Sequence, residues 1–324
     1  MIRRLTLAAL ILVASAGAAP AQQPVQLAGE RGVPASDPGA AVPLPEKVDI
    51  IMPHITDSRA LELPCFNAAF ACHVELPHWA PIQLGPLTLD LSPTKHVVFL
   101  LLSAVLVLLT LGAGARAAKR SRVEGGPPRG GFANGIEAMV LYLRNEVVLP
   151  NVGHHGDKYV PFILTLFFFI LFANLLGLVP YGSTATGNIN VTATLAIVTF
   201  VMIEIAGMRA LGRKYIGTIV YWPHDMPLAM KIPMTLIMTP VEIIGKFTKP
   251  FALMIRLFAN MTAGHVIVLA LIGLIFTFGI YVFWAPFAMA IGIMILEIFI
   301  AFLQAFVFAL LASVFIGQIR EAAH

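Results

Sequence analysis

Charged side chains are scarce in this sequence. Asp, Glu, Lys and Arg account for 12% of its 324 residues, whereas an ordinary soluble domain is about a quarter charged. Hydrophobic residues account for 58%, and the mean hydropathy is +0.86. So few charges cannot keep so much apolar surface in water, which excludes a soluble globular fold and indicates one membrane domain.

The motifs of nucleotide-dependent and metal-dependent enzymes are also missing. Gly245-Lys246-Phe247 has neither the upstream glycine nor the Ser or Thr of a phosphate-binding loop. The nine histidines are scattered, so neither a metal cluster nor a pairing of nucleophile and base is evident. The basic residues stand beside apolar segments, where they indicate membrane orientation. We therefore expect no cofactor, no metal, no nucleic acid and no enzymatic activity.

The first 94 residues are predicted to lie outside the membrane domain. Residues 1–21 have two arginines, a short apolar run and a small-residue cleavage site, which is typical of a signal peptide, with a retained anchor as the alternative. Residues 22–94 are rich in Pro and Gly without a helical period, which predicts a poorly structured extracytoplasmic arm. Within it, Cys65 and Cys72 are either a disulfide or two unpaired residues.

Residues 95–324 are predicted to form an all-α membrane domain. Apolar segments at about 96–115, 161–180 and 190–208 are long enough to span hydrocarbon. Basic residues follow the first and the third, which places those ends in the cytoplasm. Residues 132–149 have apolar side chains at helical spacing with charges between them, which predicts an amphipathic helix at the cytoplasmic interface.

Polar side chains within these segments are few. Glu204 is expected near the cytoplasmic end of the third segment, where it pairs locally. Asn174 and Asn190 are interpreted as hydrogen-bonding residues between packed helices.

The last third of the chain holds the strongest candidates. Between residues 250 and 318 the only formal charges are Arg256 and Glu297, with His265 as a third ionisable group. Ionisable groups at that depth are costly and are functional candidates by default. A capping-box pattern at 239–242 predicts that one helix begins there and runs to about residue 277.

A second helix is predicted from about residue 285 to 319, after a turn near Gly279. Both helices are too long to stand upright in a bilayer, so we expect a tilted antiparallel hairpin. In such a hairpin, residues at equal depth have numbers with a nearly constant sum. The polar pairs that meet this condition are Arg256 with Gln304, His265 with Glu297, and Glu242 with Arg320.

Arg256 is predicted to lie on a stripe of small residues. On a helical wheel, Gly245, Ala252, Ala259 and Ala263 fall near it. Such a stripe allows close approach of another helix, and its cation suits a partner with a buried carboxylate.

Each candidate also has a purely structural interpretation. Arg256 could extend to the interface from a helix end, and Glu242 could be only the capping-box acid. His265 with Glu297 could be a hydrogen-bonded structural pair, and Gln304 could only pack helices.

Four stretches of the sequence resemble subunit a of the F-type ATP synthase. They are residues 174–180, 241–250, 256–265 and 303–308. The resemblance covers roughly residues 90–320, and the block at Arg256 with its downstream glutamine is highly specific. The N-terminal arm is not part of the common pattern.

The resemblance implies a stator subunit that borders a rotating ring of c subunits and is joined to b-type stalk subunits and the F1 sector in a bacterial inner membrane. It implies that Arg256 favours ionisation of a ring carboxylate and separates two half-channels for protons. The implied lining residues are Asn260, His265, Glu297 and Gln304 in the outer half-channel and Glu242 in the cytoplasmic one. Family members with an acid at position 177 differ from this chain, which has Gly177.

Two other classes were considered. A secondary transporter would show two related halves with helices broken at matching places. No such repeat is evident in this sequence. An intramembrane enzyme would need a reactive cluster that the scattered histidines do not provide.

Overall fold

The computed structural model describes residues 57–321 with several gaps. The segments left out within that range are 65–70, 80–81, 85–86, 90–91, 125–130, 154–155, 180–181, 221, 223–226 and 280. The predicted signal peptide and Cys65 lie outside the described residues, so the cleavage and the disulfide stay predictions.

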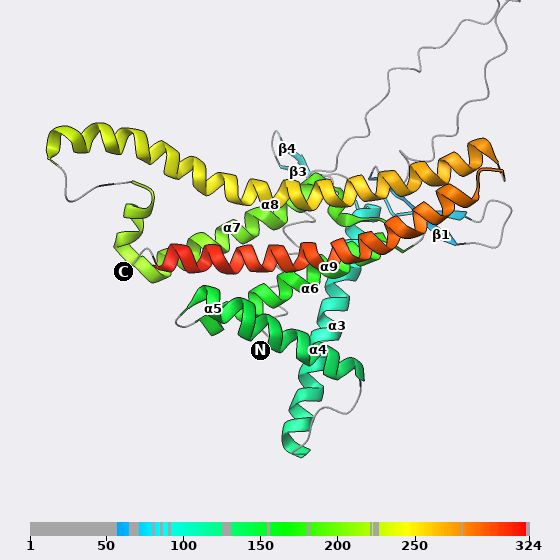
Figure 1. Ribbon diagram of the computed structural model, residues 1–324, viewed down its shortest axis with the longest axis horizontal. Helices are drawn as coiled ribbons and strands as arrows, with labels where there is room; N and C mark the ends of the chain where they lie inside the picture. Colours follow the sequence, from blue (N-terminus) through cyan, green and yellow to red (C-terminus); the bar gives the residue numbers. More distant parts are fainter. Residues whose placement is uncertain are drawn as a thin grey trace, which may run out of the picture.

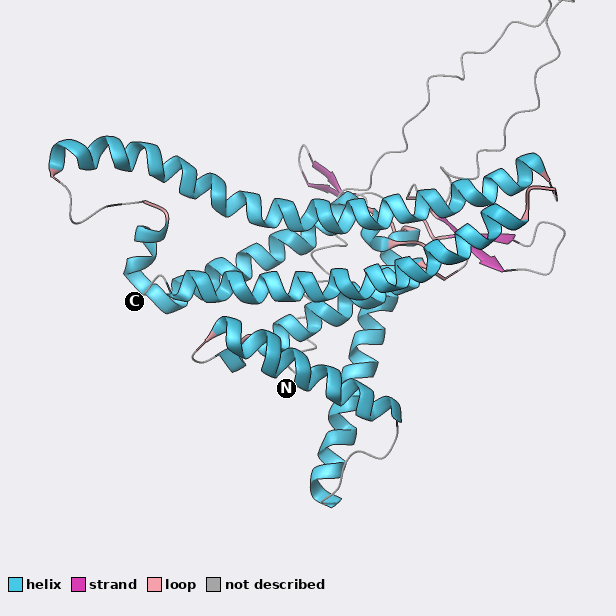
Figure 2. Ribbon diagram, viewed as in Figure 1, coloured by secondary structure: helices cyan, strands magenta, loops and turns pink. Residues whose placement is uncertain are grey.

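Five helices of the described chain are long and apolar enough to cross a membrane. They are α3 (Lys95–Glu124), α6 (Val160–Gly177), α7 (Ile189–Leu211), α8 (Leu228–Phe278) and α9 (Trp284–Glu321). This confirms the predicted all-α architecture with five membrane helices. Helix dominates the described residues, and the strands lie in the N-terminal arm (Figure 2).

The centre of the fold is α6. It has no charged residue, and its apolar window is 78% buried, against 11% for α8. A helix that is apolar all round is suited to such a position. It packs against α3 and α9, while α7 packs against both α8 and α9. The outer position of α8 leaves most of its surface uncovered.

The predicted amphipathic helix is present. α4 (Gly131–Tyr142), the π-helical segment η1 (Leu143–Val148) and α5 (Leu149–Val152) follow one another without a break. Pro150 has no N–H to donate to the preceding turn, which accounts for the altered hydrogen bonding just before it.

The end of this segment is fixed to α9. The backbone of Asn151 approaches Gly317 so closely that a Cβ at Gly317 would overlap the Asn151 carbonyl. Arg320 donates from Nη1 to the carbonyl of Val152 at 2.7 Å. Gly153 then ends α5 with a φ of 72°.

The start predicted for the fourth membrane helix is wrong. α8 begins at Leu228, after Pro227, so the capping-box residues at 239–242 lie inside the helix. Three prolines, at 233, 240 and 250, are accommodated within α8. Apolar flanks favour continued helix at each proline because an unpaired backbone in hydrocarbon is costly.

The predicted turn and second helix are confirmed. α8 ends at Gly279, whose φ is 73°, and α9 follows from Trp284. At 1.5 Å per residue, α8 is about 75 Å and α9 about 57 Å long, against about 30 Å of hydrocarbon. They form an antiparallel pair that α3 crosses at a steep angle (Figure 1).

The arm carries two short hairpins that the sequence did not predict. β1 (Ala60–Pro64) pairs with β2 (Ala71–Glu75), and β3 (Ile82–Leu84) pairs with β4 (Leu87–Leu89), both antiparallel. Cys72 lies in β2 opposite Leu63.

The arm is joined to the start of α3. Asp57 Oδ1 lies 2.9 Å from Nδ1 of His96, and both side chains are buried. The amide of Lys95 also donates to the carbonyl of Ser58 at 3.0 Å. Burial by itself would raise the pKa of Asp57, but the contacts with His96 and Thr94 and the charge of His96 together outweigh it and lower that pKa.

Candidate functional site

Arg256 lies on the outer face of α8. Leu253, Leu257 and Met261 form the side of α8 that packs on the other helices, and they are almost fully buried. Arg256 is exposed, and the ion pairs seen within the described chain do not include it. Its cation therefore points away from the rest of the molecule.

The small residues predicted to flank Arg256 share that outer face. Ala252, Ala259 and Ala263 are exposed like Arg256 itself. No side chain of the described residues approaches Gly245, since a Cβ there would meet nothing within 4 Å. The stripe is thus available to a helix from another chain.

Gln304 of α9 is a polar residue next to the outer face of α8. It is 2% exposed, and its Oε1 accepts a hydrogen bond of 3.0 Å from Nδ2 of Asn260. Asn260 is one turn beyond Arg256 on α8. The sequence predicted that Gln304 lies level with Arg256. In the structure Gln304 is hydrogen-bonded to Asn260, one turn further along α8.

Glu297 of α9 packs against the backbone of α8 at Gly264. It is 4% exposed, and a Cβ at Gly264 would overlap its carboxyl group. Within the described chain its Oε1 has no hydrogen-bond partner. His265 is the next residue along α8, so His265 and Glu297 lie at similar depth, as the register predicted.

A cluster of buried hydroxyl and amide groups lies around the short helix η3 (Ala185–Gly187), which packs against α8. Thr186 donates to Oδ1 of Asn174 at 2.7 Å. η3 packs against α3, α6, α7 and α8. Buried polar atoms without a partner within the described residues occur at Asn174, Ser183, Thr184, Thr262 and Glu297. We call Asn174, Ser183, Thr184, Thr186 and Thr262 the η3 cluster. Such atoms are suited to hydrogen-bond water.

The absence of a side chain at Gly177 is explained by its contact with Thr184. A Cβ at position 177 would overlap the Thr184 side chain. An acidic side chain at this position would therefore require the loop before η3 to move. The hydroxyl of Thr184 occupies the place beside α6 instead.

A cavity of about 250 Å³ lies at the other end of α7, next to the 3-10 helix η4 (Gly212–Thr218). Its polar lining residues are Glu204, Thr218, Glu242, Lys246, Lys249 and Gln318. We call it the η4 cavity. Phe200, Pro250 and Phe315 complete its wall on the side toward Arg256.

The η3 cluster and the η4 cavity lie toward opposite ends of α7. That helix has 23 residues and is about 35 Å long. Along α8, Glu242 precedes Arg256 by about 21 Å, and His265 follows it by about 14 Å. Arg256 thus lies between two polar regions that reach opposite ends of a membrane-spanning helix.

The structure therefore divides the predicted site residues into two groups. Asn260, His265, Glu297 and Gln304 lie near one another on the α8–α9 pair, and Glu242 lies apart in the η4 cavity. Sequence reasoning missed the hydroxyl groups of the η3 cluster and the contact between Glu204 and Lys246. Glu204 pairs with a residue 42 positions away and not locally as expected.

A metal site is not evident in the described residues. No group of three or more His, Cys, Asp or Glu side chains there is placed to hold a metal ion.

Comparisons with known proteins identify the family of this chain. Residues 97–317 match the family described as ATP synthase A chain. The chain is 44% identical to ATP synthase subunit a 2 of Chlorobaculum tepidum, over 83% of this chain and 72% of the relative. It is 40% identical to ATP synthase subunit a of Anaeromyxobacter dehalogenans strain 2CP-C, over 96% of this chain and 88% of the relative.

These matches extend over the helices that carry both polar regions. A further relative, ATP synthase subunit a of Myxococcus xanthus, is 46% identical over 73% of this chain and 75% of its own length. The chain belongs to the family of ATP synthase subunit a, the non-catalytic, proton-conducting stator subunit of the membrane sector Fo.

Proposed function

We propose that Arg256 separates two proton half-channels, one formed by the η3 cluster with Glu297 and one by the η4 cavity with Glu242. The observation that carries this proposal is the position of Arg256 between two polar regions at opposite ends of α7. Asn260, His265 and Gln304 belong to the first half-channel, because they lie on the Glu297 side of Arg256.

The proposed partner of the α8–α9 face is a ring of subunits, each with a buried carboxylate. The exposed small residues allow a neighbouring helix to come close, and the Arg256 guanidinium offers a planar set of donors to a carboxylate. A carboxylate beside Arg256 is favoured as the anion. It takes up a proton from one half-channel before it moves into lipid, because a charge in hydrocarbon is costly.

Rotation follows from this alternation. A ring carboxylate releases its proton into the other half-channel when it returns to Arg256 from the opposite side. Each elementary charge that crosses is worth about 2.3 kcal/mol per 100 mV. We infer that b-type stalk subunits hold this chain fixed against the ring and that the F1 sector uses the rotation.

The proposed location is the bacterial inner membrane with the C-terminus in the cytoplasm. Arg116, Lys119 and the following basic residues end α3, and Arg209, Arg213 and Lys214 lie at the end of α7. The positive-inside rule assigns these ends to the cytoplasm. The η4 cavity then opens on the cytoplasmic side, and the arm lies outside.

Replacement of Arg256 tests the proposal. We expect Arg256→Ala and Arg256→Gln to abolish ATP-driven proton pumping by the complex in inverted membrane vesicles. Arg256→Lys should also fail largely, because a compact ammonium does not reproduce the planar guanidinium. Pumping is measured as quenching of a pH-sensitive dye, with the amount of each subunit checked by blot.

Lys231→Ala is the matched control on the same helix. Lys231 lies over the ring of Trp222, well before the proposed path. The control should pump normally. Normal pumping by Arg256→Ala at wild-type subunit levels would refute the proposal.

A further inference from the structure

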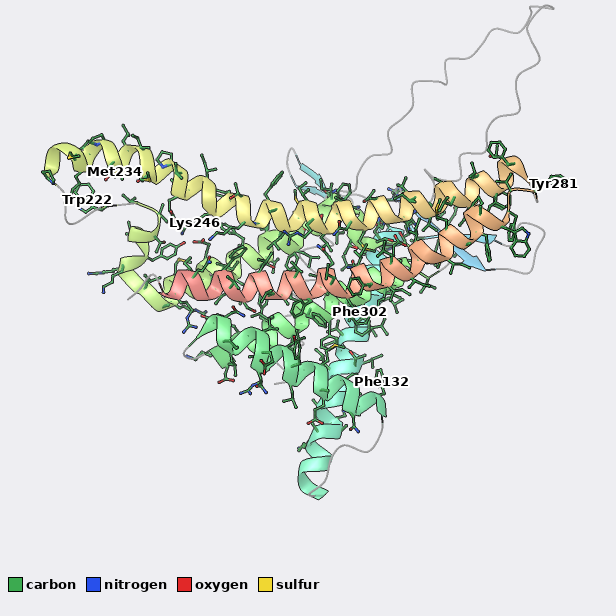
Figure 3. The ribbon with its side chains drawn as sticks, in the orientation of Figure 1. Phe132, Trp222, Met234, Lys246, Tyr281 and Phe302 are labelled. Carbon is green, nitrogen blue, oxygen red and sulfur yellow. The ribbon has the colours of Figure 1, made fainter. Side chains whose placement is uncertain are left out.

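The wall of the η4 cavity contains an ion pair to which neither the family resemblance nor the proposed mechanism gives a role. Lys246 Nζ lies 3.4 Å from Oε2 of Glu204, joining α8 to α7. Lys246 projects from α8 toward the end of α7 (Figure 3). The side chains are 14% and 16% exposed, so both are largely enclosed but still open to the cavity.

Two neutral groups hold the same ammonium. Lys246 Nζ donates to the Thr218 hydroxyl at 3.2 Å and to the Tyr215 hydroxyl at 3.4 Å. It also lies 4.7 Å from the centre of the Tyr215 ring. An ammonium has three protons to donate, and here each has an acceptor. Lys246 therefore stays in place even when Glu204 is neutral.

Glu204 makes fewer polar contacts than Lys246. Its contact with Lys246 uses Oε2, and no hydrogen bond within the described chain uses its Oε1. The separation of 3.4 Å is longer than the 2.7–2.9 Å of a tight charged hydrogen bond.

Glu204 lines the same cavity as Glu242. Glu242 and Pro250, eight residues apart on α8, both line it, so it extends about 12 Å along that helix. Pro250 precedes Arg256 by six residues, or about 9 Å. Glu204 is the second carboxylate in this wall, and it comes from α7 and not from α8.

We infer that Glu204 is a second proton-carrying carboxylate of the η4 half-channel and that Lys246 is its positioning residue. This inference rests on the proposed function. A proton released near Arg256 passes through water in the cavity to the Glu204 carboxylate, which becomes neutral. It then returns to water and reaches Glu242, and Glu204 regains its charge. No bond other than O–H forms or breaks.

The test compares variants of the whole complex in inverted vesicles by the initial rate of ATP-driven pumping. Glu204→Gln keeps the size of the side chain but cannot exchange a proton in this way, and we expect its rate to fall several-fold at wild-type subunit levels. Glu204→Asp keeps a carboxylate and should retain most of the rate.

The double variant Glu204→Gln with Lys246→Met separates proton transfer from helix fastening. It removes both charges of the Glu204–Lys246 pair, so neither is left without the other and assembly should be normal. We expect its rate to be as low as that of Glu204→Gln. A wild-type rate in either the single or the double variant would overturn the inference.

Phe247→Ala is the structural control. The Phe247 ring lies 5.6 Å from that of Phe200 and also joins α8 to α7, without a titratable group. Phe247→Ala should lower the pumping rate by the same factor at every pH of the solution that the η4 cavity faces. Glu204→Gln should instead change how the pumping rate depends on that pH. Identical pH profiles for the two variants would contradict the proton-carrying role.

Failure here is distinguishable from failure of the proposed function. Normal pumping by Glu204→Gln together with loss of pumping in Arg256→Ala would remove only the role of Glu204. Normal pumping by Arg256→Ala would remove the proposed function itself.

Discussion

Glu297 owes its position to the absence of a side chain at Gly264. The carboxyl group occupies the space that a Cβ would fill, on the face of α8 that meets α9. This glycine is not needed for a special backbone conformation, since it lies within α8. Its role is to let a carboxylate enter a tightly packed helix pair beside the η3 cluster.

Gly264→Ala should therefore impair proton pumping. The added methyl group displaces Glu297 or separates α8 from α9, and overpacking of this kind costs about 1–3 kcal/mol. The measurement is pumping in inverted vesicles with subunit levels checked by blot. Gly273→Ala is the control on the same helix, because a Cβ there meets nothing within 4 Å. Equal pumping by the two variants would show that the contact at Gly264 is not needed.

The ionisable residues of the site could be predicted from the sequence, whereas most of its neutral polar residues could not. Arg256 and Glu297 were identifiable because apolar sequence surrounds them, and His265 with them. Thr184, Thr186 and Thr262 were not, since hydroxyl residues are common in membrane helices and only the fold shows that they gather. Lys246 was passed over because a lysine near a helix end usually extends to the interface.

At the scale of elements, the α8–α9 hairpin was predictable and the start of α8 was not. The positions of polar residues gave the antiparallel register, and Gly279 marked the turn. The pattern at 239–242 has every feature of a helix start, yet it lies inside α8. Local capping signals were outweighed by apolar sequence on both sides, which favours unbroken helix in hydrocarbon.

The register leads to a prediction about the two helices as a pair. The exchange of His265→Glu with Glu297→His should retain much more pumping than either single change. Each single change puts two carboxylates or two imidazoles at one depth, and like groups oppose each other's charged form. A double-mutant cycle of pumping rates measures this coupling. Additive losses would mean that the two residues act independently.

At the scale of the whole molecule, the arm and the membrane domain meet at the Asp57–His96 contact. The membrane domain was predictable from the length and spacing of apolar segments. The attachment of the arm was not, because it depends on a single acid 39 positions before a histidine in a sequence without periodicity. The same lack of periodicity concealed the two hairpins.

Asp57→Asn should loosen the arm. It leaves the buried His96 without its charged partner, which we expect to cost about 1–3 kcal/mol. Hydrogen exchange read by mass spectrometry should show faster exchange over 57–64 and at the amide of Lys95. Exchange within α7 serves as the internal control and should not change. Unaltered exchange over 57–64 would mean that other contacts hold the arm.

The same contact predicts a response to acid. Because the pKa of Asp57 in the folded chain lies below its ordinary value of 3.8, the contribution of its charge is fully present above that value. It is lost as the pH falls through the lowered pKa. Because pepsin itself is more active in acid, cleavage of the arm is measured relative to that of Asp57→Asn at each pH. This ratio should stay low from pH 5 down to about pH 4 and rise toward one below it.

The exposed guanidinium of Arg256 also bears on how the complex is built. A chain inserted alone would hold that charge against lipid, at a cost of about 2.5–3.5 kcal/mol on insertion scales. Docking to a carboxylate-bearing partner removes the penalty, so assembly and folding stability are linked. We therefore expect an unassembled copy to be the less stable form. The residue that we propose to be needed for transport would then also make the unassembled subunit easier for quality control to recognise and remove.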